Sequence, residues 1–255
     1  MAIAPARASR PGAARAPFEQ PTRDELDSCP FCAGHEEMTP PQTFALPEDG
    51  DWRVRVVPNL YPALDRQEVV VHSRLHKRTL ADLSAQELEL VAEAWHRRRA
   101  SEPDGYLWAL VNEGREAGSS LPHSHSQLAW LPGQPDPEPA RAGDAVVERD
   151  GLVAWCPFVA RLPYESAIAP IDPEPSGFRS PLLASALALL AELVRRLHKL
   201  EGPVPLNAWL HEHESGWRLV LLPRLTILAG LELGAGVYVN TLPPEEAAAR
   251  LRAAS

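Results

Sequence analysis

Two histidines that lie one residue apart are the first candidates for chemistry in this sequence. His123 and His125 belong to the run P-H-S-H-S-Q at 122–127, which leads into an apolar segment predicted to be a strand. Side chains two apart in a strand share a face, so His123, His125 and Gln127 are expected to point the same way. An imidazole can attack phosphorus and form a phosphoramidate, which divides a group transfer into two easier steps. Two surface histidines that are close only by chance are the alternative.

The segment before these histidines is rich in glycine and serine. Residues 112–120 read N-E-G-R-E-A-G-S-S and supply backbone N–H groups of the kind that hold phosphates. A phosphate-holding loop directly before a histidine nucleophile favours a phosphoryl or nucleotidyl transfer over an incidental pair of histidines.

A pair of cysteines indicates a metal site. Cys29 and Cys32 form a C-x₂-C motif, whose spacing lets two thiolates bind one tetrahedral zinc ion at ~2.3 Å. A redox pair and two incidental thiols are the alternatives. Zinc needs two further ligands, and the candidates are His72, His76, His123 and His125. Four protein ligands leave no open position, so such a zinc ion would be structural.

The hydrophobic patterns predict an α+β fold with a repeated order of elements. Strands are expected over 52–57, 68–72, 106–112 and 127–131 in the first half, and over 152–159, 166–171, 206–211 and 217–222 in the second. A capping box of Ser84 and Glu87 begins a helix that ends near Arg99. A second helix is expected over 181–200, with Ser180 as its N-cap, and a closing helix over 243–252. The repeat predicts a duplicated unit whose antiparallel sheet buries one face against helices.

The composition excludes several classes of protein. The 255 residues are 45% hydrophobic and 23% charged, which excludes disorder of the whole chain. The net charge of −9 argues against a nucleic-acid partner. Three cysteines are too few for a disulfide framework and indicate a reduced, cytoplasmic protein. The pattern contains no membrane-spanning segment and no signal peptide.

Four motifs together resemble the galactose-1-phosphate uridylyltransferase family, a branch of the histidine-triad superfamily. They are C-P-F-C-A-G-H-E-E-M-T-P-P at 29–41, V-V-P-N-L-Y-P-A-L at 56–64, the loop and histidines at 112–127, and P-E-E-A-A-A-R-L-R at 244–252. The resemblance implies two histidine-triad-like units that form a half-barrel antiparallel sheet with helices on one side, in a chain that is usually dimeric. It divides the chain into an extended arm at 1–28, a unit with the zinc site and H-x-H-x-Q at 29–140, and a degenerate unit at 141–255.

The resemblance also assigns roles to individual residues. It implies that His125 is the nucleophile, that Ser120 and Gln127 assist it, and that a structural zinc ion is held by Cys29, Cys32, His76 and His123. The residues expected to bind the nucleotide sugar are Arg7, Arg10, Asn59, Asn112, Gly118, Ser120, Gln127 and Glu232. Arg7 and Arg10 resemble a pair that reaches across the homodimer. The implied activity is ping-pong transfer of UMP from UDP-glucose to galactose 1-phosphate or another hexose 1-phosphate.

The sequence departs from the family pattern at three places. The chain starts almost directly on the arginine segment, so the family's first strand is either missing or encoded upstream. The second half has W-R-L-V-L-L at 217–222 in place of an H-x-H, so a second metal is expected to be absent, with His211 and Glu138 as candidate remnants. Glu232 is present, but the glutamine expected after it for the acceptor sugar is not.

These departures keep two alternatives open. One is an ADP-glucose phosphorylase-like adenylyl transfer, or a nucleotide-sugar hydrolysis, through the same histidine intermediate. The other is a zinc-stabilised nucleotide-sugar-binding protein without turnover. The sequence does not distinguish the base of the donor or the acceptor.

Overall fold

The structure is a computed structural model that describes residues 1–5, 20–135 and 142–255. Arg7, Arg10 and Glu138 lie outside these ranges. Ten strands form one antiparallel sheet, in the spatial order β2 (Phe44–Leu46), β3 (Val54–Pro58), β4 (Gln67–Val71), β6 (His125–Leu131), β5 (Tyr106–Glu113), β10 (Leu206–His213), β11 (Gly216–Pro223), β9 (Ser166–Pro170), β8 (Leu152–Pro157) and β7 (Gly143–Arg149). The helices are α1 (Arg23–Ser28), α2 (Ala85–Ser101), α3 (Leu183–Glu201), α4 (Gly230–Ala235) and α5 (Pro244–Ala253).

The predicted duplication is present in the order of the elements. Each half contributes three strands, a long helix and two more strands, as β2-β3-β4-α2-β5-β6 and β7-β8-β9-α3-β10-β11. From either edge of the sheet to its middle, the five strands of each half come in the same relative order. The halves meet where β5 pairs with β10, with Ala208 opposite Val111. The α+β fold with a duplicated antiparallel unit is therefore confirmed. The division at 140/141 falls outside the described ranges and stays a prediction.

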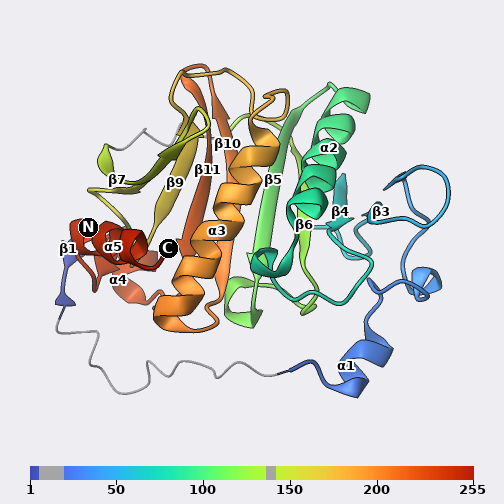
Figure 1. The fold of residues 1–255 in the computed structure, drawn as a ribbon, viewed down its shortest axis with the longest axis horizontal. Helices are drawn as coiled ribbons and strands as arrows, with labels where there is room; N and C mark the ends of the chain where they lie inside the picture. The colour runs from blue at the N-terminus through green and yellow to red at the C-terminus, as the bar shows by residue number, and fades with distance from the viewer. Residues whose placement is uncertain (6–19, 136–141) are drawn as a thin grey trace.

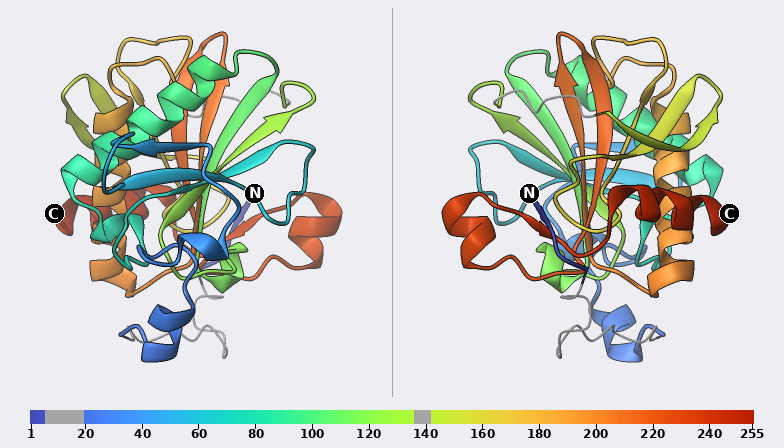
Figure 2. Two further views of the ribbon diagram at one scale, coloured as in Figure 1. Left: turned by 90° about the vertical axis from the view of Figure 1, so that its right-hand side faces the viewer. Right: turned by 90° about the vertical axis from the view of Figure 1, so that its left-hand side faces the viewer.

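The two long helices cover one face of the sheet (Figure 1). Along β5 the exposure alternates, with Leu107, Ala109 and Val111 buried and the residues between them partly exposed. Alternation of this kind turns one side of the strand to the core and leaves the other side for contacts with solvent or ligand. Figure 2 shows α2 and α3 on the core side and the short α4 on the other.

The ends of several elements differ from the prediction. The capping box of Ser84 and Glu87 begins α2 as expected. The helix α3 begins at Leu183 and not at 181, because the Ser180 hydroxyl accepts from the backbone N–H of Leu182 at 3.0 Å in the preceding turn.

The N-terminal arm is not wholly extended. It contains α1, and Ala2–Ile3 forms β1, which pairs in parallel with β12 (Val239–Asn240). The chain therefore carries a two-residue strand ahead of Arg7 and Arg10.

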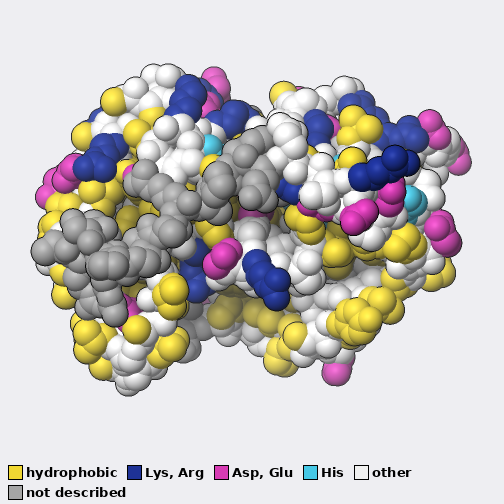
Figure 3. All heavy atoms as spheres, turned by 90° about the horizontal axis from the view of Figure 1, so that it is seen from below, with side chains coloured by type: hydrophobic (Ala, Val, Ile, Leu, Met, Phe, Trp, Pro, Cys, Tyr) yellow, Lys and Arg dark blue, Asp and Glu magenta, His cyan; other side chains and the backbone are white. Residues whose placement is uncertain are grey.

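Two properties of the surface bear on the partners. Among the described helices, none has the length and apolar character needed to cross a membrane. Seen from below, basic and acidic side chains are interspersed with hydrophobic ones, and the described residues form no single large basic patch on this face (Figure 3).

Candidate active site and metal centre

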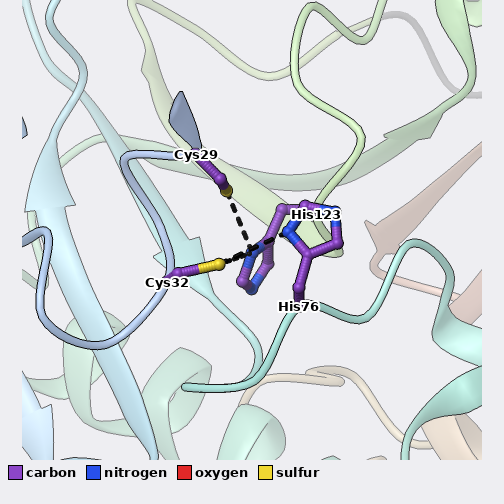
Figure 4. Close-up of side chains that lie close together, drawn as sticks. All are labelled: Cys29, Cys32, His76 and His123. Carbon is purple, nitrogen blue, oxygen red and sulfur yellow. Dashed lines mark hydrogen bonds between the residues drawn. The ribbon is translucent and has the colours of Figure 1, made fainter. Parts of the chain in front are cut away.

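Four side chains from three segments meet in a group that could hold a metal ion (Figure 4). Cys29 and Cys32 lie in the turns after α1, His76 lies between β4 and α2, and His123 lies just before β6. Their ligand atoms are all within 4.8 Å of one another. The four residues are those that the family resemblance implies.

The ring orientations of the two histidines fit metal binding. The Nδ1 of His123 lies 3.3 Å from Cys29 Sγ, and the Nδ1 of His76 lies 3.3 Å from Cys32 Sγ. Ligands that share one tetrahedral zinc ion are roughly 3.3 to 3.8 Å apart, given bonds of about 2.0 to 2.3 Å. Both Nδ1 lone pairs are free for a metal, because each Nε2–H donates elsewhere: His76 to Glu25 Oε1 at 2.8 Å and His123 to the carbonyl of Ser73 at 3.0 Å.

The electrostatics of the cysteine pair also fit a bound cation. Burial, with the neighbouring Cys29, raises the pKa of the Cys32 thiol to about 12. A divalent cation between the two sulfurs would reverse this effect, since a coordinating thiol is deprotonated. The donor set of two cysteines and two histidines is one that zinc accepts in closed structural sites.

The candidate nucleophile, His125, is the first residue of β6 and is 7% exposed. Its Nδ1 lies 2.7 Å from the backbone oxygen of His123. A carbonyl only accepts, so Nδ1 carries the hydrogen and Nε2 keeps its lone pair. Burial lowers the pKa of His125, which favours the neutral ring that a nucleophile requires.

Ser124 and Ser126, the residues on either side of His125 in the chain, hold this strand from the other face of the sheet. The hydroxyl of Ser124 is 2.9 Å from Nδ1 of the fully buried His72, and the hydroxyl of Ser126 accepts from Trp95 Nε1 on α2 at 2.9 Å. His125 is thus fixed in position by contacts on the core side, while its own ring lies on the opposite side. His72 was one of the four histidines that the sequence offered as zinc ligands, but it does not belong to the metal group.

The loop at 112–120 is shaped by glycines. Gly114 has φ +81°, and a Cβ there would lie 2.8 Å from Cβ of Pro205, so no other residue fits without a shift. Gly118 also has positive φ, at +89°, and ends a 3₁₀ turn over Arg115–Ala117. The loop therefore turns back toward β6 within a few residues. Ser120, expected to assist the nucleophile, is exposed near its end.

Carboxamide side chains extend the site across the sheet. Gln127 accepts from Gln67 Nε2 at 2.5 Å, and Asn112 Oδ1 accepts from Asn207 Nδ2 at 2.8 Å. Sequence analysis missed Gln67, Asn207 and the metal-side Glu25. No local spacing marks them, because each comes from a strand or helix remote in sequence from its partner.

The remaining candidate residues lie on other parts of the fold. Glu232 lies in α4, which Figure 1 places beside α5 and β1, far along the sheet from β6. Asn59 accepts from the backbone N–H of Tyr61 at 3.0 Å in the β3–β4 turn. His211 is buried in β10 and packs edge-on against the ring of Trp108, with centroids 6.0 Å apart.

The comparisons with known proteins agree with this architecture. Residues 59–132 match the family described as galactose-1-phosphate uridyl transferase, N-terminal domain. An ADP-glucose phosphorylase of Arabidopsis thaliana is 28% identical over 314 aligned residues, which cover 99% of this chain and 89% of the relative. A galactose-1-phosphate uridylyltransferase of Thermotoga maritima is 25% identical over 301 aligned residues, covering 92% of each chain.

The likeness extends to solved structures. The crystal structure of an ADP-glucose phosphorylase from Arabidopsis thaliana with bound ADP-glucose aligns with a TM-score of 0.83 and 26% identity, covering 98% of this chain and 94% of that one. Fold and comparisons together support an enzyme of the nucleotidyltransferase class, built on a duplicated unit of five strands and one long helix. Within that class the chain is similar to the galactose-1-phosphate uridylyltransferases, in agreement with the resemblance of its motifs.

Proposed function

We propose that the protein transfers a nucleoside monophosphate from a nucleoside diphosphate hexose through a covalent intermediate on His125. The observation that supports this most directly is the buried ring of His125, whose Nδ1–H is held by the His123 carbonyl while Nε2 keeps its lone pair beside a glycine-rich loop. Nε2 attacks the α-phosphorus, the bond from that phosphorus to the bridging oxygen breaks, and hexose 1-phosphate leaves. An oxygen of the acceptor phosphate then attacks the same phosphorus, and Nε2 is released.

In this scheme the neighbouring residues bind and orient the phosphates. The loop amides, Ser120 and the carboxamide of Gln127 stabilise the charge that develops on the phosphoryl oxygens. Asn59, Asn112 and Gly118 line the nucleotide pocket, to which Arg7, Arg10 and Glu232 contribute across a homodimer. A zinc ion held by Cys29, Cys32, His76 and His123 supplies structural rigidity when it is bound, since four protein ligands leave no position for substrate.

For the donor and acceptor we favour ADP-glucose and inorganic phosphate, which give ADP and glucose 1-phosphate. The likeness to an ADP-glucose phosphorylase over 99% of the chain supports this pair, as does the missing acceptor glutamine. The second candidate is the pair expected first from the sequence, UDP-glucose with galactose 1-phosphate. It is favoured by the likeness to the Thermotoga maritima enzyme over 92% of the chain.

The test is labelling of the zinc-loaded protein with ADP-glucose and, separately, UDP-glucose carrying radioactive α-phosphate. We expect acid-labile label on His125, its loss in His125→Asn, and its retention in the matched control His213→Asn, whose partly exposed ring bonds to Ser215 at the end of β10. Label from UDP-glucose alone, discharged by galactose 1-phosphate, would establish the second candidate. Tight binding of a nucleotide sugar with no label would identify a binding protein, and label that persists in His125→Asn would refute the mechanism.

A further inference from the structure

The guanidinium of Arg224, just after β11, is a cation without a carboxylate partner in the described part of the chain. Its Nη1 donates to Asn207 Oδ1 at 3.0 Å, and its Nε is buried with no hydrogen-bond partner among the described residues. The residue is only partly exposed, and its backbone N–H is fixed to the carbonyl of Pro205 at 2.7 Å. A partly buried cation is costly when unpaired, so this arrangement calls for an anion.

Arg224 is connected to the candidate phosphate loop through one side chain. Asn207 accepts from Arg224, and its own Nδ2 donates both to Asn112 Oδ1 and to the carbonyl of Ala117, at 2.8 Å each. Asn112 and Ala117 both belong to the glycine-rich loop segment. The guanidinium is therefore held next to the loop whose backbone N–H groups are expected to face phosphate.

The strand register places this network near His125. Val111 of β5 pairs with Ser126 of β6, so Asn112 and His125 are the next residues along adjacent strands. Asn207 pairs with Asn112 one strand further on. Neighbouring strands are about 4.8 Å apart, which puts Asn207 roughly 10 Å from the nucleophile's strand. When His125 attacks one phosphorus of a diphosphate, the second phosphoryl group lies further along the site face. It lies either on the side of Asn207 and Arg224 or on the opposite side.

We propose that Arg224 binds the phosphoryl group next to the one that His125 attacks. In the first half-reaction this group departs as hexose 1-phosphate, and in the second its place is taken by the phosphate of the acceptor. A guanidinium suits this task because its fixed donors match a phosphate dianion. This inference rests on the proposed function, to which it adds a residue that recognises both the departing and the accepting phosphate.

The experiment separates the two half-reactions. Wild type, Arg224→Gln and Arg224→Lys are first labelled on His125, and the rate of label discharge is then measured against the concentration of inorganic phosphate, glucose 1-phosphate or galactose 1-phosphate. We expect Arg224→Gln to raise the half-saturating concentration of the acceptor at least about tenfold, because it loses a charged hydrogen bond. The half-saturating concentration of Arg224→Lys should lie between those of the other two proteins, since lysine keeps the charge but lacks the paired donors of a guanidinium. The acceptor that saturates at the lowest concentration identifies which phosphate the site takes.

The matched control is Arg195→Gln on α3, whose guanidinium bonds, among the described residues, only to the backbone oxygen of Ala81 at 3.1 Å. It should discharge like wild type. An unchanged acceptor dependence in Arg224→Gln would overturn the inference, and so would an equal slowing of both half-reactions without a change in half-saturation, which indicates a merely structural role.

A second measurement does not depend on labelling. Binding of inorganic phosphate to the unlabelled proteins is followed by calorimetry, with thermal melts to show that the variants are folded. Phosphate binding that weakens in Arg224→Gln but not in Arg195→Gln supports the site even if no nucleotide sugar labels the wild type, in which case only the proposed function fails. Equal phosphate binding by wild type and Arg224→Gln would contradict the inference whatever the labelling shows.

Discussion

At the scale of single residues, the two buried glutamates near the site differ in charge state. Glu87 receives hydrogen bonds from Lys77 and Ser84, which outweigh burial and lower its pKa to about 2. Glu113, at the end of β5, accepts from the Thr79 hydroxyl at 2.6 Å and from the Leu80 N–H at 2.5 Å, and no described cation pairs with it. Burial therefore raises its pKa to about 7.

Glu113 should make the stability depend on pH. Its pKa is near 7 in the native state and about 4.5 when unfolded, so between these values the native state binds more protons. This contribution to stability is complete below pH ~4.5 and is lost as pH rises through ~7, with a slope of at most about 1.4 kcal/mol per pH unit. Urea unfolding from pH 5 to 8 should show that slope in wild type and in Glu116→Gln, an exposed control, but not in Glu113→Gln. Parallel profiles for all three proteins would contradict the assignment.

The residues of the site were predictable to different degrees. Cysteine and histidine spacing indicated a metal site and a reactive histidine, yet left four histidines open as ligands. The family resemblance narrowed these to His76 and His123, and the structure brings both to the cysteines. Glu25, Asn207 and Arg224 could not be found in this way, because their contacts depend on how distant strands and helices pack. A sequence pattern records local periodicity and not those contacts.

At the scale of elements, the short helix α1 has a role that its composition did not indicate. The sequence of residues 1–28 predicts an extended arm, but α1 carries Glu25 to the Nε2 of His76 at 2.8 Å. Glu25 also pairs with Arg78, and these contacts lower its pKa despite burial. A carboxylate of this kind orients a metal-bound histidine and raises its basicity.

We expect Glu25→Gln to weaken zinc binding by about 10- to 100-fold, because His76 loses its charged partner. Competition with a chromogenic chelator measures this affinity directly. Asp27→Asn in the same helix is the matched control, since Asp27 faces solvent and its side chain is 71% exposed. Equal zinc affinities for the two variants would show that α1 does not support the metal centre.

The limits of prediction at this scale have physical causes. The capping box of α2 was found because two side chains three residues apart specify it locally. The strand β7 was missed because it is a polar edge strand, G-D-A-V-V-E-R, with a register shift between Ala145 and Val147. One buried position in seven gives no clear alternation for a pattern to detect.

At the scale of the whole molecule, the two halves share one sheet and one core. β5 and β10 pair over five residues, from Leu206 opposite Glu113 to Leu210 opposite Ala109, and α2 packs beside α3. Separating the halves would expose this central strand pair and the apolar faces of both helices. The predicted division near residue 140 is thus expected to mark a repeat and not an independent folding unit.

The zinc-loaded protein should accordingly unfold in one cooperative transition. Calorimetry should give a ratio of calorimetric to van't Hoff enthalpy near unity, and circular dichroism and tryptophan fluorescence should change together. Two separated transitions, or a fragment of residues 142–255 that melts cooperatively by itself, would show that the halves are independent domains.

The junction of β5 with β10 also bears on how a fold with two similar halves can carry different residues in each half. Two separate chains of five strands each could form the same sheet about a two-fold axis, but each would then have to carry every residue of the site. Fusion into one chain lifts that constraint. β11 holds the position in its half that β6 holds in the other, yet it has W-R-L-V-L-L at 217–222 where the first half has its histidine strand. The second copy differs from the first at this strand, and across the junction its Asn207 donates hydrogen bonds to Asn112 and Ala117 of the first copy.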